Sequence, residues 1–132
     1  MTRILKSIFL SGVILTLLPG RGFAAVPTPS TPTGVALGAW LTAFNSGDAK
    51  LLQAFYHSYS WNGRSDEDQK MRSATGELIL LRITSDEKFQ IQALLKESKT
   101  GTRDRIRIVI NEKNPSSINT IILLSEMVPF PK

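Results

Sequence analysis

The chain has 132 residues, enough for one domain, and its lack of cysteine excludes a disulfide-stabilised scaffold and a cysteine nucleophile. Its formal net charge is +5, but Arg3, Lys6 and Arg21 lie in a predicted leader. The 13 basic and 11 acidic residues after that leader give a balance of only +2, so we expect no nucleic-acid partner.

The N-terminal residues have the pattern of a secretory signal peptide. A basic start precedes an apolar run at residues 7–18, Pro19 and Gly20 interrupt that run, and Ala24 ends the small-residue motif GFA. We therefore expect a signal peptide over residues 1–24 and a periplasmic or secreted product. The alternative is an uncleaved anchor, but a spanning helix needs about 20 apolar residues. We expect no membrane span after cleavage.

Residues 25–33, AVPTPSTPT, form a Pro/Thr-rich lead-in with no repeating apolar position. Such a segment is flexible or polyproline-like. It is interpreted as either a spacer or a frayed terminus, and the predicted domain covers residues 34–132.

A helical hairpin is predicted at the start of this domain. Thr33 can cap the first helix, whose apolar positions follow the i, i+3, i+4, i+7 spacing and are Leu37, Trp40, Leu41 and Phe44. Gly47 can adopt a left-handed conformation at the turn, and Asp48 can cap the second helix. The apolar face of that second helix consists of Leu51, Leu52, Phe55, Tyr56 and Tyr59.

A third, short helix is predicted from Asp66 to about Thr75, with Ser65 as its cap and Gly76 at its end. The hydrophobic period then changes to that of strands, which we expect at residues 77–84, 88–97, 103–111 and 118–127. The links between them are short, which indicates an antiparallel meander.

Three helices followed by four antiparallel strands predict an α+β domain. The isoleucines of residues 103–111 alternate with arginines, so we expect the isoleucines to face the helices. The sheet is expected to curve so that all three helices close over that face. Arg103, Arg105 and Arg107 form a stripe on the other face, which either is solvated or binds an anionic partner.

Three segments of the chain resemble a known family. ALGAWLTAFNSGD, TGELILLRI and MVPFP are similar to segments of the NTF2-like (SnoaL-like, cone-shaped) superfamily, and more narrowly of the domain ahead of the catalytic domain in exported bacterial serine hydrolases and carboxyl-terminal-processing peptidases. The resemblance covers residues 37–131, although Glu77 stands where the family more often has a second glycine. The chemistry of those proteins resides in the domain that follows. The resemblance therefore implies an NTF2-like cone and an exported binding or accessory module without hydrolase activity.

No catalytic constellation is evident in the sequence. His57 is the only histidine, no metal-ligand spacing or GxSxG motif occurs, and we expect His57 to be a solvated or edge residue. We predict no metal site, no cofactor and no catalytic residue.

The alternative is a small isomerase or cyclase of the ketosteroid-isomerase or polyketide-cyclase type. Such chemistry needs a carboxylate base in an apolar pocket opposite a hydrogen-bond donor. Tyr56 or Tyr59 could provide the donor. The acids considered for the base are Asp66, Glu67, Asp68, Glu77 and Glu126. The first three begin a helix, whose dipole should lower their pKa, and no acid is expected in the middle of an apolar strand face.

Tyr56, Tyr59 and Trp61 are the candidate ligand-binding residues, because tyrosine and tryptophan bring polar groups to an apolar rim. The predicted function is an exported, non-catalytic NTF2-like module that binds a protein partner or a small apolar ligand, possibly as an accessory to a periplasmic hydrolase. A homodimer is an open alternative for its assembly.

Overall fold

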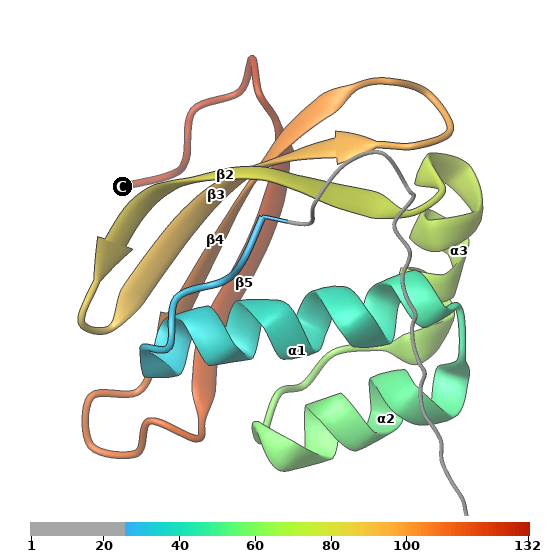
Figure 1. The fold of residues 1–132 in the computed structure, drawn as a ribbon. Helices are drawn as coiled ribbons and strands as arrows, with labels where there is room; N and C mark the ends of the chain where they lie inside the picture. Colours follow the sequence, from blue (N-terminus) through green and yellow to red (C-terminus); the bar gives the residue numbers. More distant parts are fainter. Residues whose placement is uncertain (1–25) are drawn as a thin grey trace, which may run out of the picture.

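The computed structural model describes residues 26–132 and contains three helices followed by four strands (Figure 1). The helices are α1 (Pro32–Ser46), α2 (Ala49–Ser58) and α3 (Ser65–Thr75). The strands are β2 (Leu78–Glu87), β3 (Gln90–Glu97), β4 (Arg103–Ile110) and β5 (Ile118–Ser125). The predicted α+β class and the order of elements are confirmed. The predicted signal peptide lies outside the described residues.

The strands form one sheet in the order β2-β3-β4-β5, with every neighbouring pair antiparallel. The predicted meander is therefore confirmed. Ile91 pairs with Ile108, and Ala93 pairs with Ile106, so alternate residues of β3 and β4 line the same face. No helix among residues 26–132 is long and apolar enough to cross a membrane.

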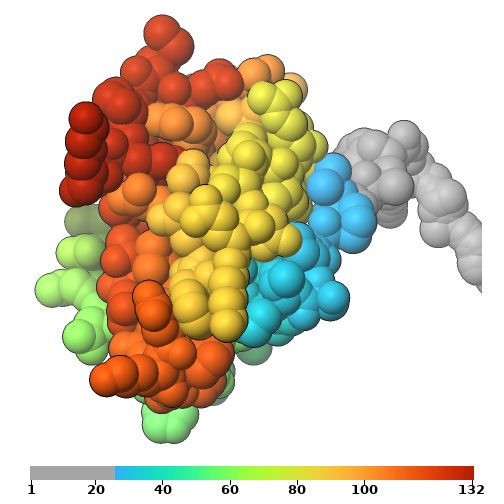
Figure 2. All heavy atoms as spheres, turned by 90° about the vertical axis from the view of Figure 1, so that its left-hand side faces the viewer, coloured from blue at the N-terminus to red at the C-terminus, as the bar shows by residue number. Residues whose placement is uncertain are grey.

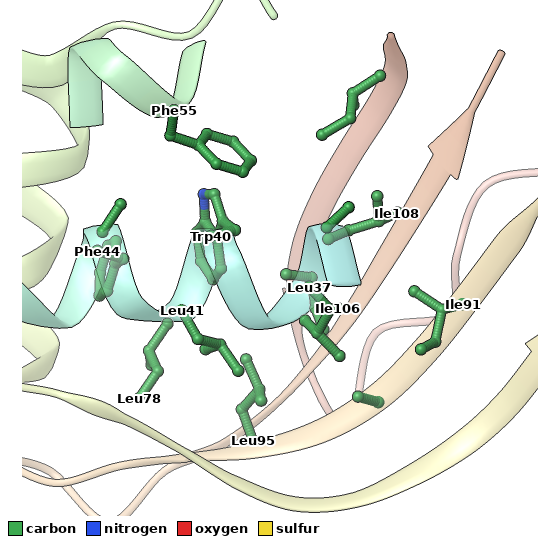
Figure 3. Close-up of a cluster of buried hydrophobic side chains, with 14 of the residues drawn as sticks. Leu37, Trp40, Leu41, Phe44, Phe55, Leu78, Ile91, Leu95, Ile106 and Ile108 are labelled. Carbon is green, nitrogen blue, oxygen red and sulfur yellow. The ribbon is translucent and has the colours of Figure 1, made fainter. Parts of the chain in front are cut away.

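Helix α1 lies on the inner face of the sheet and supplies much of the core. Its buried apolar residues include Leu37, Trp40 and Phe44, and the buried strand residues opposite them include Ile106 and Ile108. Figure 3 shows Leu37 of α1 next to Ile106 and Ile108 of β4, and the ring of Phe55 from α2 beside Trp40. The expectation that the isoleucines of β4 face the helices is confirmed.

The sheet is not curled, which corrects the expected curvature. Only α1 packs broadly on the strands, whereas α2 packs on α1 and α3. A single helix can cover the inner face of a twisted open sheet, so nothing forces the strands to bend around three helices.

The first helix begins two residues earlier than predicted. Thr31 is its cap and accepts a hydrogen bond from the backbone N–H of Gly34, while the predicted cap Thr33 is fully buried inside the helix. Pro32 occupies the first helical position, where the missing N–H has no helical partner to lose. The proline that was assigned to the lead-in is therefore part of the helix.

The AFNSGD turn joins two helices and also fixes the start of the sheet. Gly47 is left-handed with φ of 70°, and Asp48 accepts a hydrogen bond from the N–H of Lys50, as predicted. Asn45 adds an unpredicted role, because its side chain donates to the carbonyl of Leu78 at 2.9 Å and accepts from the N–H of Leu78 at 2.8 Å. One amide thus satisfies both backbone groups of the first residue of β2.

The outer face of the sheet is covered in part, which corrects the expectation of a solvated face. Arg105 and Arg107 are only partly exposed, because residues 126–132 turn back over them. In Figure 1 this tail lies on the side of the sheet away from α1 and α2. Arg103 is more exposed and forms an ion pair with Glu126 at 2.9 Å.

Candidate functional site

A cavity of about 360 Å3 opens between α3, β5 and the loop that follows α2. We call it the α3 cavity. It is lined by Trp40, Trp61, Asn62, Gly63, Arg64, Glu67, Asp68, Met71, Ile121 and Leu123. Its volume lies at the lower end of the range for small-molecule sites.

Tryptophan, methionine and aliphatic side chains form one wall of the α3 cavity. Trp40 is 2% exposed and stacks on Phe44 with ring centroids 5.0 Å apart, so this wall is anchored in the core. Trp61 is half-buried, and its backbone N–H donates to the carbonyl of Tyr56 at 2.8 Å. A Cβ at Gly63 would lie 2.6 Å from the ring of Tyr56 and 2.8 Å from the indole nitrogen of Trp61. Only glycine therefore permits this loop to close over the two aromatic rings.

Asp68 is the half-buried carboxylate of the α3 cavity, which the exposed Glu67 also lines, and Tyr56 is the hydrogen-bond partner of Asp68. The Tyr56 hydroxyl donates to Asp68 Oδ2. Burial raises the pKa of Asp68, and the hydrogen bond from Tyr56 opposes that rise. Burial and the bond to Asp68 raise the pKa of Tyr56, so the phenol stays protonated and remains a donor. The α3 cavity thus combines an apolar wall with the Asp68 carboxylate, whose orientation is set by a tyrosine.

The three acids at the start of α3 have different environments, although the sequence predicted a lowered pKa for all of them. Arg64 Nη2 lies 3.3 Å from Asp66 Oδ2, and this hydrogen bond lowers the pKa of Asp66. Glu67 lies 3.4 Å from Arg64 Nε and is exposed. The prediction is wrong for Asp68, because burial outweighs its position at a helix start. Arg64 caps α3 without a side-chain hydrogen bond, so Ser65 is not the cap that was predicted.

The predicted ligand-binding residues do not form one site. Trp61 lines the α3 cavity and Tyr56 bonds to its carboxylate. Tyr59 lies elsewhere, packed on Phe55 at 4.9 Å between ring centroids and lining a groove along α1 and α2. His57 is exposed, as expected of a solvated histidine.

The other acids that were considered for a base lie outside the α3 cavity. Glu77 is exposed and lies 3.9 Å from Arg72, and Glu126 pairs with Arg103. The hydrogen bond from Arg103 lowers the pKa of Glu126, which does not suit a general base at pH 7.

Asp104 is a buried acid that the sequence reading missed. It lies on β4 two residues before Ile106, is 5% exposed, and its Oδ2 is buried without a hydrogen-bond partner. Burial raises its pKa to about 7, with further contributions from the hydrogen bond to Glu97 and from the charge of Glu97. The alternation of RDRIRIVI was a usable signal, since it places residue 104 in the same row as the isoleucines. Asp104 does not line the α3 cavity.

Within the part of the chain that the structure describes, no group of three histidine, aspartate or glutamate side chains is placed to hold a metal ion. Comparisons with protein-family models, with curated proteins and with solved structures found no match. The functional interpretation therefore depends on the geometry of the α3 cavity.

Proposed function

We propose that this chain is an exported, non-catalytic binding module, periplasmic or secreted, that holds a small, largely apolar ligand in the α3 cavity. The observation that carries the proposal is the cavity itself, where Trp40, Trp61 and Leu123 form an apolar wall next to the carboxylate that Tyr56 orients. Ligand sites in proteins commonly combine such a wall with few polar groups.

The NTF2-like assignment belongs to the same proposal. The order of three helices and four antiparallel strands supports it, as does the hydrogen-bonded AFNSGD turn. The open sheet requires one change from the expected cone, because the α3 cavity lies beside α3 and is not enclosed by curled strands. We propose further that a separately encoded exported hydrolase is the protein partner. The support for this partner is the resemblance of residues 37–131 to domains that precede hydrolase domains.

Native mass spectrometry of the protein purified from its own cell envelope tests the ligand proposal. The wild-type protein should carry a bound small molecule, and Trp61→Ala should lose it because the variant removes a large part of the apolar wall. Tyr59→Ala is the matched control, because Tyr59 is an aromatic residue outside the cavity. Equal ligand occupancy in both variants, or no ligand in the wild type, contradicts the proposal.

A specific observation favours a second candidate, a ketosteroid-isomerase or polyketide-cyclase type of enzyme. Asp68 has a raised pKa and lies with a tyrosine hydroxyl at a cavity, and such chemistry uses a carboxylate base together with a tyrosine donor. The binding module remains first because the Tyr56 hydroxyl already donates to Asp68. A donor held by the base is not available to stabilise an oxyanion on a substrate.

Absorbance assays with a β,γ-unsaturated ketosteroid separate the two candidates. The binding module should produce no conjugated enone above the buffer rate. Turnover by the wild type that is lost in Asp68→Asn, with the fold retained by circular dichroism, would establish the enzyme and overturn our ranking.

A further inference from the structure

The tail, residues 126–132, is bound to β4 by three arginines at alternate positions. We call Arg103, Arg105 and Arg107 the arginine row. Arg103 forms two hydrogen bonds to the carboxylate of Glu126, at 3.1 and 2.9 Å. Arg105 donates to the carbonyl of Val128, and Arg107 donates to the carbonyl of Pro131 at 3.1 Å. Each arginine of the row therefore contacts a later position of the same peptide segment.

One aromatic side chain of the tail lies against two arginines of the row. The guanidinium carbons of Arg105 and Arg107 are 4.6 and 4.8 Å from the centroid of the Phe130 ring. Cation–π contacts of this kind contribute about 0.5–1 kcal/mol each at partly exposed sites. Figure 2 shows the end of the chain, in dark red, at the upper left edge of this face, next to red and orange atoms.

The tail provides a carboxylate for Arg103 but none for the other two arginines of the row. Among residues 26–132, no carboxylate forms a salt bridge with Arg105 or Arg107. Their partners in the tail are neutral carbonyls, and the Nε atoms of both arginines are buried without a hydrogen-bond partner. A carboxylate can neutralise the charge of a guanidinium and bind it through two parallel hydrogen bonds, which a single carbonyl oxygen cannot do. A ligand with carboxylates at these positions would thus bind the row more strongly than the tail does.

The spacing of the row fits an extended peptide. Alternate residues of a strand lie about 6.5–7 Å apart, which is also the spacing of alternate side chains in an extended segment. We propose that the outer face of β4 is a peptide-binding surface that the tail occupies within the chain, and that an extended partner segment with carboxylates on both sides of an aromatic residue displaces the tail. The aromatic residue takes the place of Phe130, and the carboxylates take the places of the carbonyls of Val128 and Pro131.

Fluorescence anisotropy with a defined peptide tests this proposal. The probe is a dye-labelled nine-residue peptide in which glutamates alternate with valines around one central phenylalanine. Phe130→Ala should bind the probe about five- to tenfold more tightly than the wild type, because the tail loses two cation–π contacts and competes less well. Arg107→Gln should weaken binding by at least about tenfold, since it removes one charge-assisted pair.

Matched controls distinguish this surface from general electrostatic attraction and from the α3 cavity. Lys113→Gln removes the same charge from an exposed turn and should change the affinity less than about twofold. Trp61→Ala should leave peptide binding unchanged, because Trp61 lines the α3 cavity and makes none of the contacts between the arginine row and the tail. The same peptide with lysines in place of glutamates should not bind.

Three results would overturn the proposal. The first is equal affinity of the wild type and Phe130→Ala for the glutamate peptide. The second is an equal loss of affinity in Lys113→Gln and Arg107→Gln. The third is binding to phosphatidylglycerol vesicles, or self-association of Phe130→Ala in sedimentation experiments, without binding of the peptide.

Discussion

The two sides of β4 are covered in different ways. On the inner side Ile106, Ile108 and Ile110 are at most 1% exposed and pack in the same core as α1. On the outer side Arg105 and Arg107 bind a short tail through single hydrogen bonds and one shared aromatic ring. Apolar burial is worth about 25 cal/mol per Å2, whereas partly exposed polar contacts contribute little net free energy. The inner side should therefore determine stability, and the outer side can exchange its covering segment at small cost.

The largest expected effect is on the inner side. Phe44→Ala should lower the free energy of unfolding by about 3–5 kcal/mol, because Phe44 is fully buried and its loss leaves a cavity under α1. Urea denaturation followed by circular dichroism measures this change. Leu51→Ala is the control, because Leu51 is 47% exposed and should cost less than about 1 kcal/mol. Equal losses of stability in the two variants would contradict the conclusion that the buried inner side determines the stability of the fold.

The next effect concerns the point where α1 joins the sheet. Asn45→Ala removes both hydrogen bonds to Leu78, a residue that is 2% exposed. We expect a loss of about 1–3 kcal/mol, since buried backbone groups lose their partner. Asn119→Ala removes the same amide from an exposed position and should be nearly neutral in the same denaturation experiment. A neutral Asn45→Ala would show that the turn merely links two helices.

Asp104 is an ionisable residue in the otherwise apolar row on the inner side of β4. Its titration should therefore make the stability of that side depend on pH. Its pKa is about 7 in the folded protein against 3.8 for an ordinary aspartate. The folded state therefore holds a proton that the unfolded chain has lost, so stability falls as the pH rises from about 4 to 7. Asp104→Asn removes this loss. We expect the variant to exceed the wild type by roughly 1–2 kcal/mol at pH 8 and to show no gain at pH 4.

Denaturation of the two proteins at several pH values measures the effect of Asp104. Glu87→Gln is the control, because it removes one negative charge from an exposed position. The same gain in this control would assign the effect to net charge. A gain for Asp104→Asn that is equal at pH 4 and pH 8 would contradict a proton held by Asp104.

Local features of the fold were predictable from the sequence, and long-range features were not. The helical spacing from Leu37 to Phe44, the left-handed Gly47 and the alternation in β4 depend on neighbours within a few residues. The absence of curling in the sheet goes with the packing of α2 against α1 instead of the strands, and no local sequence pattern predicts that packing.

Two residues at the α3 cavity were predicted from the sequence, but the long-range contacts that form the cavity were not. Tyr56 and Trp61 were candidates because of their residue types, but the cavity that Trp61 shares with Ile121 and Leu123 joins segments about 60 residues apart. The raised pKa of Asp68 follows from that distant packing, which a helix-dipole argument does not include. The burial of Asp104 could have been predicted, because the alternation of β4 places it in the same row as the isoleucines. Its position near the end of the strand made that burial less evident.

The smallest expected effect is on the outer side. Phe130→Ala removes two cation–π contacts from a partly exposed ring and should lower the free energy of unfolding by about 1 kcal/mol. The denaturation midpoint should shift little, while the tail should become more accessible to limited proteolysis. A Phe130→Ala loss that approaches the Phe44→Ala loss would mean that the tail is part of the cooperative core. In that case a partner peptide could not displace the tail without unfolding the sheet, and both sides of β4 would contribute to the stability of the fold in the same way.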